Sequence, residues 1–215
     1  MILAAVLSGF VAALIAPALV RRMPSVSGCL LAVLPAGLAV YFARLLFVTP
    51  PGGQITTFAW APSLNLTLSL NADGLGLFFA VLISGIGAIV VVYSGGYLAG
   101  HPQLGRFYGW LLTFMGAMLG VALSDNLLLL YVFWELTSIS SYMLIGFDHE
   151  EATARAAALQ ALLVTVLGGV ALLAGAIMLG IAGGSMEISV LLTRREILQA
   201  SPLFLPALIL VLLGA

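Results

Sequence analysis

Apolar runs long enough to cross a bilayer recur along the whole chain, and they constrain the fold more than any other feature. In windows of about 19 residues the sequence divides into seven such stretches. They cover Ile2–Val20, Ser25–Val48, Leu75–Leu98, Phe107–Leu123, Leu127–Phe147, Arg155–Ala182 and the run from Pro202 to Ala215. Because backbone polar groups find no water in the hydrocarbon layer, each stretch is predicted to be helical. The sequence therefore predicts an all-α, multi-pass membrane protein embedded in a lipid bilayer.

Composition supports this class and excludes others. Hydrophobic residues make up 63% of the chain and charged residues 7%, against roughly 25% charged residues in soluble domains. A net charge of −1 gives no basis for nucleic-acid binding. The single cysteine, Cys29, excludes a disulfide within the chain, and His149-Glu150-Glu151 lacks metal-ligand spacing on a helix face. We therefore expect no metal and no cofactor.

The last apolar stretch is shorter than a bilayer requires. Its 14 residues make about 21 Å of helix, against a hydrocarbon core of about 30 Å. A chain end in mid-membrane would leave carbonyl groups unpaired in lipid. We therefore expect a fragment, truncated in the seventh helix, whose remainder lies downstream of Ala215.

Arginine distribution predicts the orientation, because all seven basic residues are arginines and cytoplasmic loops carry the excess of positive charge. The first apolar run is followed by Arg21 and Arg22 rather than preceded by basic residues, which favours an uncleaved span with its N-terminus outside. This orientation places Arg21, Arg22, Arg106 and Arg155 inside and Arg194 and Arg195 outside. We expect this topology in the cell (inner) membrane.

One segment has the period of a strand rather than of a helix. Leu64–Asn71 alternates strictly between apolar and polar residues, which is typical of a half-buried strand. Phe58–Trp60 precedes it, and Pro62 lies between the two. The pattern predicts a small external β-hairpin at about residues 54–72 that lies on the helical bundle.

Glu135 is the only acidic residue inside an apolar stretch, and it lies near the middle of Leu127–Phe147. An ionisable residue at that depth costs on the order of 2.5–3.5 kcal/mol on insertion scales, so it is a candidate functional residue. Tyr131, Ser138 and Tyr142 share its helical face and form a polar stripe suited to moving protons. The alternative is a protonated side chain that only makes an interhelical hydrogen bond.

Other polar and small residues have simpler explanations. Arg44, near the outer end of its span, is expected to extend its guanidinium to the interface, although without any lysine it is also a possible partner for Glu135. Asp73 and Asp125 precede apolar helices and are expected to cap them. The small-residue pairs Gly116/Gly120 and Gly168/Gly169 are expected to permit close helix packing.

Three segments resemble a known family. The run Ser124–Phe147, which contains Trp134-Glu135-Leu136-Thr137-Ser138, closely resembles the fifth transmembrane helix of the NADH:quinone oxidoreductase/Mrp antiporter membrane subunits. Arg155–Gly169 and Asn71–Leu75 resemble the sixth helix and the start of the third. Within this superfamily the pattern is nearest to the A subunits of Mrp-type multisubunit cation/proton antiporters.

The resemblance implies a bundle of about fourteen helices with two inverted five-helix repeats. Residues 1–106 would then hold three leading helices and the hairpin, and residues 107–215 would begin the first repeat. The family's fifth-helix glutamate corresponds to Glu135, and its lysine partner is expected beyond Ala215. The resemblance also implies exchange of protons for Na⁺ or another monovalent cation, together with other subunits.

Two further functions stay open at this point. The same architecture serves as a proton-pumping subunit of respiratory NADH:quinone oxidoreductases and membrane-bound hydrogenases. A subunit that only supports assembly, without transport, is the third possibility. Glu135 at mid-membrane argues against the last of these.

Overall fold

The computed structural model describes residues 1–50, 52–61 and 66–215, and helices dominate it. Six helices within these residues are long and apolar enough to cross a membrane. They are α1 (Ile2–Arg22), α2 (Ser27–Val48), α3 (Gly74–Tyr97), α4 (Leu104–Leu123), α5 (Leu127–Ile145) and α6 (Ala152–Gly183). The prediction of a multi-pass, all-α membrane protein is confirmed.

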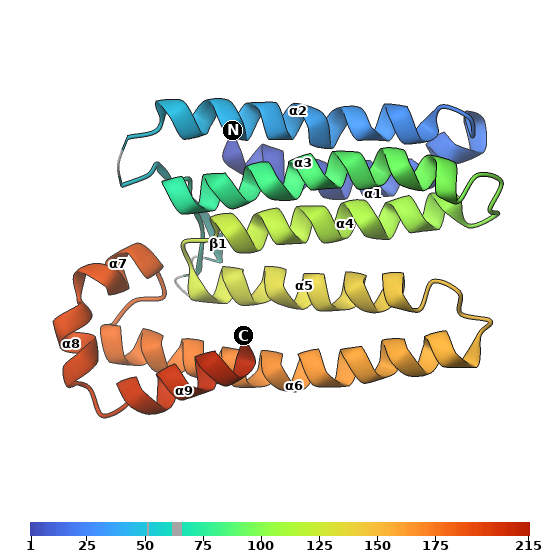
Figure 1. Ribbon diagram of the computed structural model, residues 1–215. Coiled ribbons are helices and arrows are strands. Elements are labelled where there is room, and N and C mark those ends of the chain that lie inside the picture. The colour runs from blue at the N-terminus through green and yellow to red at the C-terminus, as the bar shows by residue number, and fades with distance from the viewer. Residues whose placement is uncertain (51, 62–65) are drawn as a thin grey trace.

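The six helices lie side by side with their axes roughly parallel and their directions alternating (Figure 1). In the bundle α2 packs on α3, α1 on α4, α4 on α5 and α5 on α6. The α1–α2, α3–α4 and α5–α6 connections gather at one end of the bundle (Figure 1). The strands and two short helices gather at the opposite end.

The seventh apolar stretch forms a shorter helix, α9 (Phe204–Gly214), which packs against α6. Between α6 and α9 lie two short helices that the sequence pattern did not predict, α7 (Ile188–Thr193) and α8 (Arg195–Ala200). Six-residue helices show too few turns for a periodic signal. Their positions depend instead on contacts with distant segments.

The predicted β-hairpin is confirmed. Strand β1 (Ile55–Ala61) pairs antiparallel with β2 (Leu66–Asn71), and Ile55 lies opposite Asn71. Pro62, Leu64 and Asn65, which belonged to the predicted pattern, lie outside the described residues. Leu70 is fully buried, but so is Ser69 on the other face of the strand. The strand is therefore enclosed on both faces at Ser69 and Leu70, whereas Thr67, Leu68 and Asn71 are half-buried.

Glycines allow the helices to approach closely, as the small-residue pairs predicted. The Cα of Gly116 lies 3.1 Å from the position that a Cβ on Gly9 would occupy, so α1 and α4 meet almost backbone to backbone. A Cβ on Gly120 would overlap the ring of Phe133 on α5. Small side chains at such positions give the van der Waals contact that holds helices together in lipid.

Asp73 caps α3 as predicted, because its Oδ1 accepts a hydrogen bond from Gly76 N at 2.7 Å. The predicted role of Asp125 is wrong. Asn126 is the N-cap of α5, and its side chain accepts hydrogen bonds from the first backbone N–H groups of that helix. Asn126 has the extended backbone that an N-cap requires, which leaves Asp125 free to bind elsewhere.

Asp125 instead joins three segments at the hairpin end of the bundle. Its carboxylate accepts hydrogen bonds from the backbone N and the hydroxyl of Ser189, at 2.9 and 2.7 Å, next to the start of α7. Ser69 of β2 donates to the same carboxylate at 3.5 Å and accepts the backbone N–H of Asp125 at 2.8 Å. Asp125 therefore fixes α7 and the hairpin to the α4–α5 turn.

Candidate functional site

Helix α5 lies between α4 and α6, and it presents different chemistry to each neighbour. Phe133 packs against Gly120 of α4 and stacks on Phe10 of α1 with 6.4 Å between ring centroids. Glu135 is two residues further along, about 200° around the helix, so it points to the other side. There it meets Gly169 of α6. The carboxyl group therefore lies between α5 and α6.

The carboxyl group of Glu135 is only partly satisfied. Oε1 is buried and has no hydrogen-bond partner among the described residues. Leaving a buried polar atom unpaired costs on the order of 1–3 kcal/mol, so such atoms are rare in folded proteins. The phenol of Tyr131, one helical turn earlier, lies beside the carboxyl group. The described residues thus provide one polar neighbour and leave one oxygen unused.

The structure brings together only part of the predicted polar stripe. Tyr131 lies beside Glu135, as its spacing predicted. Ser138 is buried, but its hydroxyl donates to the backbone oxygen of Trp134 at 3.3 Å. Tyr142 is half-buried nearly two turns beyond Glu135. Serine hydroxyls inside a helix often hydrogen-bond the backbone carbonyl of the preceding turn in this way.

Gly169 belongs to this site, although the sequence pattern suggested only a packing role. It is buried, and a Cβ on it would overlap Oε1 of Glu135 and lie 3.2 Å from the carboxyl carbon. A sequence signal did exist, because Gly169 lies near the middle of α6 and Glu135 near the middle of α5. Mid-helix residues of adjacent antiparallel spans lie at similar depth, but which faces meet is set by packing alone.

Arg44 is not the partner of Glu135 within the described chain. Its side chain is exposed, and α2, which carries it, lies at the edge of the bundle away from α6 (Figure 1). Exposure near the end of an apolar helix fits the expected extension of the guanidinium to the interface.

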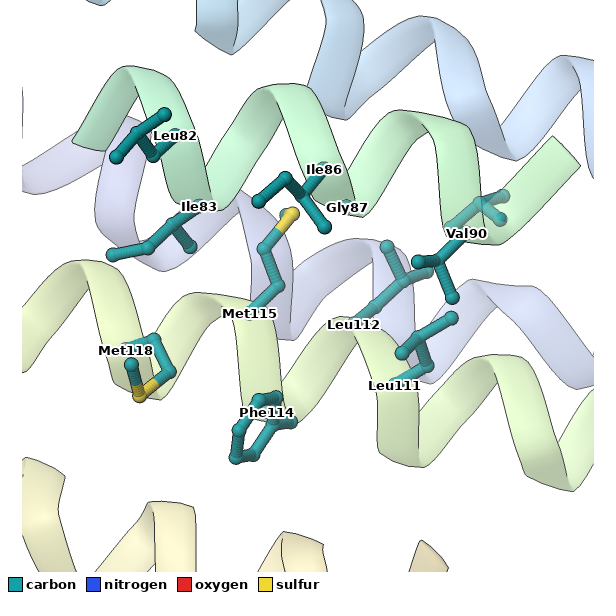
Figure 2. Close-up of a pocket in the computed structure, with 11 residues that line it drawn as sticks. Leu82, Ile83, Ile86, Gly87, Val90, Leu111, Leu112, Phe114, Met115 and Met118 are labelled. Atoms are coloured by element: carbon teal, nitrogen blue, oxygen red, sulfur yellow. The ribbon is translucent and has the colours of Figure 1, made fainter. Parts of the chain in front are cut away.

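A separate hollow of about 300 Å³ opens between α3 and α4 (Figure 2). Its lining consists of aliphatic, aromatic and thioether side chains and one glycine, including Leu82, Ile86, Met115 and Met118. Such a surface offers no ligand for an ion, since hydration must be replaced by polar atoms. The hollow is therefore not a candidate for ion transport.

The polar cluster at the α1–α2 end of the bundle has no geometry suited to a metal. His101, His149, Glu150 and Glu151 line a shallow hollow there. Across the described ranges, no group of three or more His, Cys, Asp or Glu side chains is arranged to hold a metal ion. Arg155 donates hydrogen bonds to the carbonyl oxygens of His149 and Glu150 at 2.6 and 2.9 Å. These contacts secure the loop.

Comparison with known proteins gives a consistent family. Residues 124–215 match the family model described as NADH:quinone oxidoreductase/Mrp antiporter, transmembrane, and residues 58–108 match the N-terminus of chain 5 of NADH-ubiquinone oxidoreductase (complex I). Subunit A1 of a Na⁺/H⁺ antiporter from Staphylococcus haemolyticus is 45% identical over 98% of this chain and 26% of its own length. The chain thus spans about a quarter of the length of the curated relatives it matches.

Solved structures agree with this family. A chain of the Mrp complex from Dietzia sp. matches 99% of this chain and 23% of its own length, at 33% identity and a TM-score of 0.88. A chain of respiratory complex I from Thermus thermophilus matches 90% of this chain and 39% of its own length, at 25% identity and a TM-score of 0.73. The chain therefore belongs to the family of NADH:quinone oxidoreductase/Mrp antiporter membrane subunits.

Proposed function

We propose that the chain forms part of a membrane subunit of a multisubunit antiporter that exchanges Na⁺ or another monovalent cation for protons, and that Glu135 carries the proton. The relatives named as subunit A1 of Na⁺/H⁺ antiporters support the exchange reaction. The relation to complex I leaves a redox-driven proton pump as the second candidate. In either case the chain acts as an ion-transport subunit, together with other subunits.

The observation that carries the proposal is the buried, unpaired Oε1 of Glu135. A side chain that served only to join helices would have both oxygens in hydrogen bonds, because an unpaired oxygen gains nothing and costs desolvation. An oxygen left free inside the bundle is available to a proton, to water or to a cation from another part of the protein. Tyr131 lies beside it, and in this proposal its phenol is the first polar group of the proton path.

The proposal also covers the organisation of the chain and its orientation in the membrane. Residues 1–106 act as a leading unit and residues 107–215 begin the first transport repeat. The N-terminus lies outside the cell membrane, so the hairpin, α7 and α8 face outward. A lysine on a segment beyond Ala215 would supply the cation that faces Glu135, as the family pattern implies.

The decisive experiment is Glu135→Gln in the full-length protein within its complete complex. Glutamine keeps the size and hydrogen bonding of the side chain but has no titratable proton. We expect normal assembly and at least about a tenfold loss of cation-dependent proton flux in inverted vesicles between pH 7 and 9, since general acid–base groups contribute factors of this order or more. Glu135→Asp should retain part of the flux, with a shifted pH profile.

A fully active, normally assembled Glu135→Gln complex would show that the side chain is only a structural contact, and it would return the scaffold function to consideration. The redox alternative has its own test. Quinone-reductase activity that is coupled to proton movement in the purified complex would favour a redox-driven pump over an antiporter. Flux driven by a Na⁺ gradient alone would favour the antiporter.

A further inference from the structure

We propose that Gly169 is a positioning residue for Glu135: the side chain it lacks creates a notch in α6 into which the carboxyl group fits. This inference rests on the proposed role of Glu135. It adds a second residue, from another helix, that sets where the carboxyl group lies.

The contact itself leaves no room for a larger residue. A Cβ on Gly169 would overlap Oε1 of Glu135, and it would lie 3.2 Å from Cδ and 3.8 Å from Oε2. All three of these atoms belong to the carboxyl group, so the notch receives the end of the side chain. Even alanine at position 169 would force that group to move.

The adjacent glycine shows that the notch is specific to one flank of α6. Gly168 does not face Glu135, and a Cβ on it would lie 3.2 Å from the backbone oxygen of Gly214 at the end of α9. The two neighbouring glycines thus admit different partners, with α5 on one flank and α9 on the other. Gly168 provides a matched control on the same helix at the same depth.

The two neighbours of α5 are occupied differently around Glu135. Helix α5 packs on α4 and α6, and Phe133 fills the α4 side against Gly120. Among the described residues, the titratable group beside Glu135 is Tyr131 on its own helix. Displacing the carboxyl group from the notch would therefore change its distance to Tyr131 and the access of water to Oε1.

The test is a set of variants in the full-length complex, measured as flux per assembled complex and as the pH profile of that flux. Gly169→Ala should lower flux about tenfold and shift the pH profile, because it displaces the proton-carrying carboxyl group from its position relative to Tyr131 and water. Gly168→Ala should leave the pH profile unchanged, with any loss confined to the amount of assembled complex.

Rescue by a shorter side chain makes the test specific. Glu135→Asp withdraws the carboxyl group by one methylene, about 1.5 Å, which makes room for the alanine methyl group. In the Gly169→Ala background, Glu135→Asp should raise flux above that of Gly169→Ala alone, the sign of direct coupling in a double-mutant cycle. Wild-type flux and pH profile in Gly169→Ala, or a double variant no better than Gly169→Ala, would overturn the proposal.

Failure to assemble would also be informative. If Gly169→Ala does not assemble, Glu135→Ala in the same background should restore assembly, because it removes the overlapping atoms. A double variant that still fails to assemble would place the conflict elsewhere and end the proposal. These outcomes are separable from the proposed function: loss of flux in Glu135→Gln with an unaffected Gly169→Ala would retain the proton carrier and reject the notch.

Discussion

Asp125 and Glu135 lie ten residues apart on one segment of the chain, and the fold surrounds their carboxyl groups in opposite ways. Asp125 is 3% exposed, and each of its oxygens accepts hydrogen bonds from other segments. Glu135 is half-buried, and its Oε1 has no partner among the described residues. A satisfied buried acid stabilises the fold, whereas an unsatisfied one costs stability and therefore points to function.

The two residues also differ in depth. Asp125 lies at the end of α5 beside the hairpin, and Glu135 lies about 15 Å further along the helix at 1.5 Å per residue. Near the helix end, backbone N–H groups and serine hydroxyls are available to bind a carboxylate. At mid-helix every backbone group is used within its own helix, so a carboxyl group there depends on side chains from other elements.

The largest expected effect on stability comes from Asp125→Ala. This change leaves the backbone N–H and hydroxyl of Ser189 without their acceptor, so we expect a loss of about 3 kcal/mol. The measurement is the thermal midpoint and yield of the solubilised complex. Flux per assembled complex should stay near the wild-type value. A stable Asp125→Ala complex without flux would break the comparison, because it would place Asp125 in the transport path.

Ser189→Ala should have a smaller effect of the same kind. It removes one hydrogen bond of 2.7 Å to Asp125 while the backbone N–H of residue 189 still binds the carboxylate. We expect a loss of about 1 kcal/mol, read from the same thermal midpoint, and unchanged flux. A loss as large as that of Asp125→Ala would mean that the hydroxyl, rather than the carboxylate, organises this end of the bundle.

Glu135→Ala should change stability least, by less than about 1 kcal/mol, because its buried oxygen has no hydrogen bond to lose and the small cavity offsets the relief of desolvation. Flux should nevertheless disappear. Comparing the thermal midpoints of Glu135→Ala and Asp125→Ala tests this directly. Equal destabilisation by the two variants would remove the distinction between a structural and a functional acid.

Cysteine labelling tests the orientation, and the substitutions it needs should affect neither flux nor stability. In a Cys29→Ala background, a cysteine at Gln54 beside the hairpin should react only with a thiol reagent added outside the cell. A cysteine at Pro102 should react only with reagent added on the cytoplasmic side. Both positions are exposed, so the introduced thiols are accessible to a reagent. Equal labelling of Gln54 and Pro102 from one side would contradict the topology.

The sequence by itself determined the class of protein, the positions of the six long helices and the β-hairpin. Long apolar runs become helices in lipid, because a helix satisfies its backbone hydrogen bonds within itself. Strict alternation at Leu66–Asn71 indicates a strand, because successive side chains of a strand point to opposite faces. It also singled out Glu135 as a candidate, since one acid in a long apolar run is visible without any structure. The predicted ends of the six long helices were correct to within a few residues.

Only the tertiary structure decided what surrounds these residues. It revealed that Asp125 binds Ser189 rather than capping α5, that α7 and α8 are helical, and that Gly169 faces Glu135. Each of these depends on contacts between segments that are far apart in the sequence. Helix periodicity indicates which face of a span is polar or small, but it cannot indicate which neighbouring helix that face meets, because the pairing depends on how all the helices pack together.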